Sequence, residues 1–162
     1  FYIHTGGLDL FARREIMPIL GFDQVYSPSE DKENFEPLKN IYRCATKIYC
    51  AKSDQSTFDY VKQYLNINSN KNLFITILTL DAHGPYRSSS FIKTNEIETY
   101  KTIALDSINQ ISRFIENILS TDSNSNISFI VTSDHPPILT SLANKYHPKL
   151  KRYNFSFLIH KN

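Results

Sequence analysis

The chain has 162 residues, of which 41% are hydrophobic and 21% charged, and its formal net charge is +2. This length suits one ordinary domain with a sizeable core, and the composition excludes an intrinsically disordered chain. The chain has no block of Lys or Arg that would suit a phosphate backbone, so no nucleic-acid partner is expected. No apolar segment approaches the roughly 20 residues of a membrane span.

The first residues, Phe1-Tyr-Ile-His4, are typical of the end of a strand and include no initiator Met. We therefore expect a piece of a longer protein whose upstream residues are missing, so that the absence of a targeting segment from this sequence means little. The turn Thr5-Gly6-Gly7 allows the backbone to pass close to another group. A helix is predicted over residues 8–20, with Pro18 kinking or shortening it and Gly21 closing it.

A short strand is predicted at residues 24–26, and an irregular surface segment at residues 27–52. This segment contains Cys44 and Cys50, the two cysteines of the chain. Their spacing matches no zinc-binding motif. Two thiols and a short-loop disulfide both remain open at this point, and the disulfide would imply an extracytoplasmic compartment.

The second predicted helix begins near Asp54 or Ser56, either of which can cap it. It buries Phe58, Val61 and Leu65 at helical spacing. A polar turn then leads to the most regular strand pattern of the chain, at residues 73–80. This run is apolar and β-branched, which predicts a strand covered on both faces.

Polar side chains follow that strand directly. Asp81 and His83 come immediately after it, and Gly84-Pro85 prevents the strand from continuing. A Ser-rich loop is expected at residues 87–95. The longest helix is predicted over residues 96–120, with Asp106 solvated. Its apolar stripe consists of Ile97, Tyr100, Ala104, Ile108, Ile111, Ile115 and Ile118.

The run Ile127 to Val131 is predicted to be a buried strand. Asp134 and His135 follow where this strand ends, and Pro136-Pro137 stop it. Side chains of neighbouring residues on a strand point to opposite faces, so this pair can share a ligand only beyond the strand end. A short helix or loop at residues 139–150 and a last strand at 153–159 complete the chain.

Helices between apolar strands predict an α/β fold, with a three-layer, mostly parallel sheet and helices on both faces. In such a sheet the polar ends of the strands lie along one edge. His4, His83, Asp134 and His135 would then converge there, together with Arg13. Asp and His suit a divalent metal, and Arg suits phosphate or sulfate oxygens. Three unrelated polar caps are the alternative.

The chain resembles the alkaline-phosphatase superfamily, in its sulfatase-like branch of lipoteichoic acid synthases and phosphoglycerol transferases. Five stretches carry the resemblance in the family's order, and they span most of the chain. They are residues 4–13 with Gly21-Phe-Asp23, Ser53-Asp-Gln-Ser-Thr-Phe58, Ala82-His-Gly-Pro-Tyr86, the helix from Tyr100 to Asp106, and Thr132-Ser-Asp-His-Pro136.

The resemblance implies a role for each matching residue. Asp134 and His135 match a metal-ligand pair, for one divalent ion such as Mn or Zn, with Ca or Mg as other candidates. His83 matches a catalytic histidine that contacts the substrate phosphate. The expected substrate-binding residues are His4, Phe11 and Arg13. At Gly6 relatives can carry an acidic pocket residue, and at Pro136 many members have Gly.

By the same resemblance, the nucleophile and another acidic metal ligand lie in an upstream half of a single domain that residues 1–162 only partly cover. We therefore expect an inactive fragment that binds metal weakly. The full protein would be anchored in a membrane by an upstream segment, outside the cytoplasm, and act on a phosphate- or sulfate-bearing lipid or glycan. In that compartment Cys44 and Cys50 are expected to be disulfide-bonded. A non-catalytic binding or structural domain with the same fold is the alternative.

Overall fold

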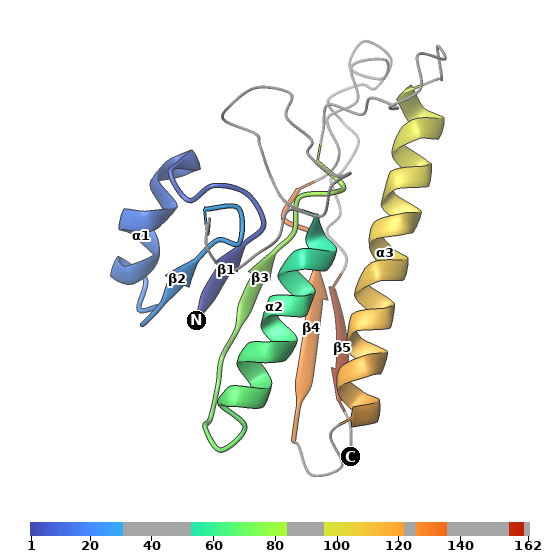
Figure 1. The fold of residues 1–162 in the computed structure, drawn as a ribbon. Helices are drawn as coiled ribbons and strands as arrows, with labels where there is room; N and C mark the ends of the chain where they lie inside the picture. Colours follow the sequence, from blue (N-terminus) through green and yellow to red (C-terminus); the bar gives the residue numbers. More distant parts are fainter. Residues whose placement is uncertain (31–52, 84–95, 122–125, 136–155, 161–162) are drawn as a thin grey trace. The chain divides into compact units, whose positions relative to one another are not determined.

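The structure, a computed structural model, describes residues 1–30, 53–83, 96–121, 126–135 and 156–160 (Figure 1). It contains two compact units, Phe1–Asp81 (unit 1) and Ala82–Asn162 (unit 2). A parallel sheet with helices confirms the predicted α/β class. Several predicted features lie outside the described residues, namely Cys44, Cys50, the loop at 87–95, Pro136-Pro137 and the segment 139–150.

Unit 1 is built on a parallel sheet of strand order β2-β1-β3. The strands are β1 (Tyr2–His4), β2 (Val25–Tyr26) and β3 (Thr76–Leu78). All residues of the central strand β1 are buried, as expected where a parallel strand has neighbours on both sides. Because the three strands run in one direction, the residues that follow them gather at one edge of the sheet.

Strand β3 is shorter and more exposed than the sequence predicted. Thr76–Leu78 is half-buried, and Phe74 is 74% exposed. The prediction of a strand covered on both faces is therefore wrong for the described residues. β3 is an edge strand of the described sheet, so it has a neighbouring strand on one side only, whereas β1 has one on each side.

The helix predicted over residues 8–20 is divided into two pieces. A 3-10 turn, η1 (Leu10–Ala12), precedes α1 (Arg13–Ile19). The division falls where Phe11 and Ala12 take left-handed backbone angles, with φ of 58° and 50°. Such angles cannot continue a right-handed helix.

The end of α1 agrees with the prediction. Pro18 lies in its last turn, and the helix ends one residue later. Gly21 has a φ of +94°, a conformation that suits glycine. Its amide donates to the carbonyl of Pro18 (3.0 Å), and the amide of Phe22 donates to that of Met17 (3.2 Å). These two bonds form a Schellman motif.

Helix α2 (Asp54–Ile67) is capped by Ser53, whose hydroxyl accepts the amide of Ser56 at 3.3 Å. The predicted caps, Asp54 and Ser56, are therefore wrong. Asp54 instead turns its carboxylate to the end of β3. Phe58 and Val61 are buried as predicted, and Leu65 is half-buried. Aromatic rings join α2 to β1 and β2, through Phe1, Tyr26, Tyr60 and Tyr64.

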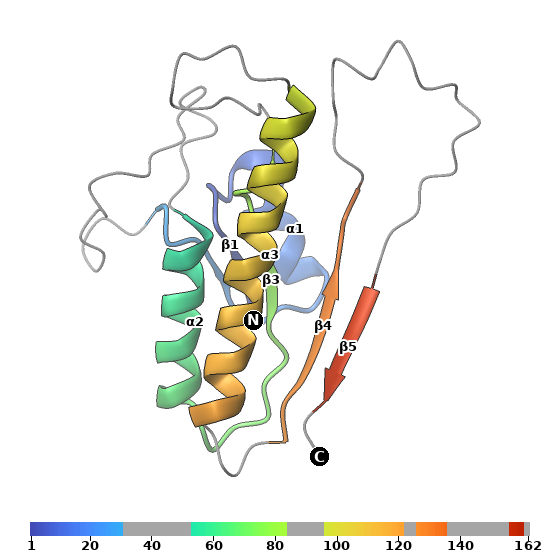
Figure 2. The ribbon, with the colours of Figure 1, turned by 90° about the vertical axis from the view of Figure 1, so that its right-hand side faces the viewer.

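Unit 2 combines α3 (Glu96–Thr121) with the strands β4 (Ser128–Thr132) and β5 (Ser156–His160). The two strands pair antiparallel and lie side by side (Figure 2). Phe114 of α3 meets Phe129 of β4 edge to face, at 6.2 Å between ring centroids. This contact packs one face of the strand pair.

Two predictions of burial in unit 2 are wrong. Ile130 of β4 is 72% exposed and Ile108 of α3 is 59% exposed. Ile115 and Ile118 of the predicted stripe are buried as expected, and Ser107 and Phe114, which lie off that stripe, are buried with them. Asp106 is exposed, as predicted. In the part of the chain that the structure describes, no helix has the length and hydropathy of a membrane span.

Candidate active site at the strand ends

His4 ends strand β1 and is fully buried. Its Nδ1 lies 2.7 Å from the carbonyl oxygen of Gly6. A carbonyl only accepts hydrogen bonds, so Nδ1 carries the ring proton. Burial lowers the pKa of His4 to about 4, which keeps the imidazole neutral at pH 7. Nε2 therefore presents a lone pair, and this atom has no hydrogen-bond partner within the described segments.

Gly6 makes room for this ring. A Cβ at position 6 would lie 3.0 Å from Cε1 of His4 and 3.4 Å from Cδ1 of Leu80. The sequence predicted that the turn Thr5-Gly6-Gly7 would allow a close approach, and at Gly6 the approaching group is the imidazole. A side chain here would displace it.

Phe11 and Arg13 lie in the same unit as His4. The guanidinium carbon of Arg13 is 5.1 Å from the ring centroid of Phe11, in cation–π geometry. After burial, the positive charge of Arg13 also contributes to lowering the pKa of His4. Phe11 is 73% exposed. The structure thus brings together all three residues that were predicted to bind substrate.

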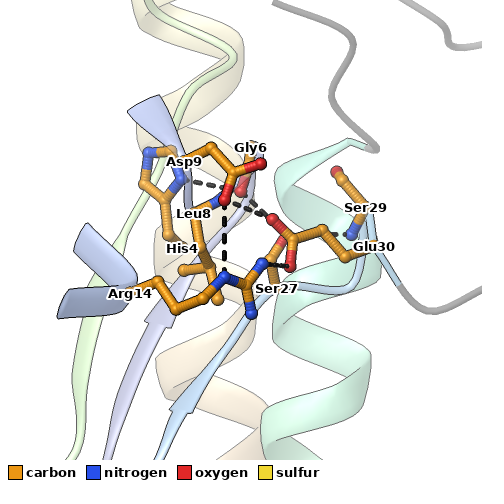
Figure 3. Close-up of polar contacts among 8 residues, drawn as sticks. All are labelled: His4, Gly6, Leu8, Asp9, Arg14, Ser27, Ser29 and Glu30. Carbon is orange, nitrogen blue, oxygen red and sulfur yellow. Dashed lines mark hydrogen bonds and ion pairs between the residues drawn. The ribbon is translucent and has the colours of Figure 1, made fainter. Parts of the chain in front are cut away.

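The turn after β2 holds the turn after β1 by hydrogen bonds (Figure 3). The hydroxyl of Ser27 donates to the carbonyl of Gly6 at 2.7 Å, and the hydroxyl of Ser29 donates to the carbonyl of Thr5. Ser27 also accepts the amide of Ser29 at 3.1 Å. The polar backbone beside His4 is therefore satisfied by side chains of the neighbouring turn. These bonds were not predicted, because residue 27 was assigned to an irregular surface segment.

A carboxylate completes the contact between these turns. Glu30 accepts the amide of Leu8 at 2.5 Å through Oε1 and binds Nη2 of Arg14 at 2.5 Å through Oε2. Arg14 also contacts Asp9, with 3.4 Å between Nε and Oδ1. Neither Glu30 nor Arg14 was predicted to belong to a site. Neither was singled out by a sequence motif, and isolated charged residues are common on protein surfaces.

Asp54 was also missed, because it was interpreted as a helix cap. Its carboxylate is almost fully buried and accepts the amides of Leu80 (2.7 Å) and Asp81 (2.9 Å) at the end of β3. Burial, and next the charge of Asp81, raise the pKa of Asp54 to about 6. Nearby, the hydroxyls of Thr5 and Thr57 lie 2.9 Å apart. These bonds tie the start of α2 to the ends of β1 and β3.

In unit 2, strand β4 ends at Thr132, and Asp134 and His135 lie in a bend beyond it. The side chains are close, with 3.5 Å between Oδ2 and Nε2, and the amide of His135 donates to Oδ1 at 2.8 Å. The ring of His83 is 6.1 Å from that of His135, edge to face. The expectation that this pair lies beyond the strand end is confirmed.

The spacing of this pair fits a shared cation. Adjacent donors on a tetrahedral ion with bonds of about 2.0–2.1 Å are about 3.3 Å apart, close to the 3.5 Å between Oδ2 of Asp134 and Nε2 of His135. Within the described ranges, no group of three or more His, Cys, Asp or Glu side chains surrounds a metal position. That Asp134 and His135 hold part of a metal site stays a prediction.

Comparison with known proteins adds to this geometry. The Sulfatase family profile matches residues 1–162. The chain belongs to the sulfatase family. The crystal structure of the lipoteichoic acid synthase LtaP from Listeria monocytogenes is similar, with a TM-score of 0.68 and 17% identity. The match covers 90% of this chain and 35% of that one. No curated protein sequence matches.

At this identity, the likeness to LtaP shows that the sulfatase-family chain shares its alkaline-phosphatase-like fold. The predicted site residues of the chain form two groups. His4, Phe11 and Arg13 lie in unit 1, and His83 lies with Asp134 and His135 in unit 2. That both groups form one site stays a prediction.

Proposed function

We propose that residues 1–162 are the C-terminal part of the catalytic domain of a metal-dependent transferase. It moves a phosphoglycerol- or phosphoethanolamine-type group on a lipid or glycan of the cell envelope. A sulfatase-like hydrolase is the nearest variant of this function. Membership of the sulfatase family supports the proposal, and the pairing of Asp134 with His135 beside His83 is the observation that carries it.

Asp134 and His135 would hold one divalent ion, Mn or Zn, with Ca or Mg as alternatives. Bound there, the ion would lower the pKa of a hydroxyl nucleophile and stabilise negative charge on the transferred group. We place that nucleophile and the remaining ligands upstream of residue 1. The bond from the amide of His135 orients Oδ1 of Asp134, so Oδ2 is the oxygen left for the ion.

His83 would act on the reacting group itself. Its ring stands edge to face against His135, and the side chain is exposed. An imidazole in this place can donate a hydrogen bond to a phosphate oxygen or protonate the leaving group. We assign it this catalytic role.

The residues of unit 1 would bind the head group. Arg13 offers a planar fork of donors to phosphate oxygens. We propose a different contact for His4. Its Nδ1–H donates to the carbonyl of Gly6, and its unprotonated Nε2 carries a lone pair. Toward a substrate the ring can therefore accept a hydrogen bond but not donate one. It suits the hydroxyl of a glycerol or the ammonium of an ethanolamine.

The proposed place of action is outside the cytoplasm, with a membrane anchor upstream of residue 1. The test uses the whole natural protein in membranes, with fluorescent phosphatidylglycerol as donor. We expect Mn²⁺-dependent formation of the fluorescent diacylglycerol. Nitrophenyl sulfate, in parallel, tests the hydrolase variant.

Asp134→Ala should remove the activity, and Asp106→Ala, which changes an exposed carboxylate of the same unit, should preserve it. Turnover of neither substrate by the wild-type protein would contradict the proposal. It would favour the alternative of a non-catalytic domain with the same fold.

A further inference from the structure

Two adjacent residues beside Arg13 have an unfavourable backbone. Phe11 has φ 58° and ψ 29°, and Ala12 has φ 50° and ψ 37°. Both lie in the left-handed region, which is unfavourable for residues with a Cβ. Such a conformation persists only where surrounding contacts hold it. The backbone conformation of the segment that carries Phe11 and Arg13 is therefore held by contacts with other residues, and the local sequence alone would not favour it.

Contacts at both ends of this segment meet at one carboxylate (Figure 3). At the first end, the amide of Leu8 donates to Oε1 of Glu30 at 2.5 Å, and the Leu8 side chain is buried. At the other end, Nη2 of Arg14 binds Oε2 of Glu30 at 2.5 Å. The amide of Arg14 also donates to the carbonyl of Leu8 at 3.3 Å. Glu30 thus closes residues 8–14 into a loop.

We propose that Glu30 and Arg14 are positioning residues that hold residues 8–14 closed and so fix Phe11 and Arg13 for binding the head group. Neither residue needs to touch the substrate. The consequence for substrate binding rests on the proposed function, whereas the closing of the loop can be tested without any activity.

The geometry distinguishes this contact from an ordinary surface ion pair. The side chains of Arg14 and Glu30 are 51% and 31% exposed, and exposed pairs alone contribute little. Here, however, the same carboxylate also accepts a backbone amide, and charge-assisted bonds of this kind are the stronger ones. Glu30→Gln keeps the size of the side chain but removes its charge from both bonds.

The first experiment measures kinetics of the whole natural protein with the fluorescent lipid. Glu30→Gln and Arg14→Gln should each raise KM about tenfold, equivalent to one decade of affinity, and leave kcat within about twofold. Glu15→Gln is the matched control, since Glu15 is an exposed carboxylate of the same helix. It should behave as wild type.

The second experiment needs no turnover. Hydrogen exchange at the Leu8 amide should become about tenfold faster in Glu30→Gln and in Arg14→Gln, but not in Glu15→Gln. The dissociation constant for glycerol phosphate should rise in the same two variants. Unchanged exchange at Leu8 would overturn the proposal. Faster exchange with unchanged KM and unchanged glycerol phosphate binding would overturn the positioning role.

The two experiments also separate this proposal from the proposed function. If the wild-type protein turns over neither substrate, the proposed function fails. The closing of the loop is then still supported by faster exchange at Leu8, and its positioning role by weaker binding of glycerol phosphate.

Discussion

The ends of β1 and β4 both carry a histidine, but they are built differently. His4, at the end of β1, is fully buried, and side chains from the turn after β2 hold the backbone beside it. His135, beyond β4, has a side chain 47% exposed, and Asp134 beside it is 62% exposed. The side chain at the first strand end is held by its own neighbourhood in the chain, whereas the pair beyond the second strand end is partly exposed to solvent.

Two carboxylates show the same contrast. Both oxygens of Asp54 accept backbone amides in a buried position. This residue therefore has a structural role, and neither oxygen is left for an ion. Asp134 accepts one amide through Oδ1, and its Oδ2 lies 3.5 Å from Nε2 of His135 in a side chain that is 62% exposed. A buried carboxylate with satisfied oxygens stabilises a fold, and an exposed one beside an imidazole suits a cation.

The largest effect is expected from Asp134→Ala in the whole natural protein. If Asp134 holds the ion as proposed, its loss removes several kcal/mol of charge stabilisation, so activity should fall on the order of 10³-fold or more. The fold should be unaffected, because the side chain is 62% exposed. Lipid turnover and thermal unfolding followed by circular dichroism measure the two effects.

Metal titration extends this test. Residues 1–162 alone should bind Mn²⁺ or Zn²⁺ weakly, and the whole protein should bind more tightly. Isothermal titration of each, with and without Asp134→Ala, makes the comparison. If residues 1–162 bind tightly and still do so after Asp134→Ala, the ligands lie elsewhere.

The next largest effect is expected from Asp54→Ala. It leaves the amides of Leu80 and Asp81 without their acceptors, and each unsatisfied buried group costs about 1–3 kcal/mol. The free energy of unfolding should fall by about 3 kcal/mol in urea titrations. Asp59→Ala, on the same helix, is the control. The side chain of Asp59 is 44% exposed and pairs with Lys62 at 2.9 Å, so its loss should cost at most about 1 kcal/mol. Equal losses would show that Asp54 is not buried in this way.

The contrast between the two strand ends also explains what the sequence could predict. The strands and helices follow from local patterns, and so do His4, Arg13 and Asp134 at or near strand ends. The roles of Asp54 and Glu30 depend on which backbone amides face their oxygens. That is decided by pairing between segments distant in the chain, such as Leu8 with Glu30, and no local pattern encodes it.

Helix and strand faces show the same limit. The spacing of apolar residues predicted α3 well, but Phe114 replaces Ile108 on its buried face. Phe114 meets Phe129 of β4 edge to face, a contact between separate segments that the spacing within the helix does not encode. The break at Phe11 and Ala12 was missed because both residue types normally continue a helix.

A smaller effect is expected from pH, where His4 and Asp54 act in opposite directions. Burial lowers the pKa of His4 to about 4, so its contribution to stability is complete above its unfolded value of about 6.5 and is lost as pH falls toward 4. The pKa of Asp54 is raised to about 6, so its contribution is complete below about 3.8 and is lost as pH rises through 6.

On acidification from pH 7 to pH 5, the free energy of unfolding should therefore fall by about 2 kcal/mol through His4 and rise by about 1 kcal/mol through Asp54. His4→Gln removes the first effect. Relative to wild type, this variant should gain about 2 kcal/mol of unfolding free energy on going from pH 7 to pH 5. Urea titrations at both pH values measure the gain. Parallel behaviour of variant and wild type would mean that His4 is not buried as a neutral ring.

The smallest effect is expected from Ala12→Gly, which tests the strain at the β1 end. A left-handed alanine costs about 1–2 kcal/mol, and glycine removes this cost but loses about 0.5–1 kcal/mol through the greater freedom of the unfolded chain. The net result should be a gain of about 0.5 kcal/mol in unfolding free energy. Ala104→Gly, inside the regular helix α3, should instead lose about 1 kcal/mol. Opposite signs for the same substitution would confirm the left-handed backbone at Ala12, and losses at both sites would rule it out.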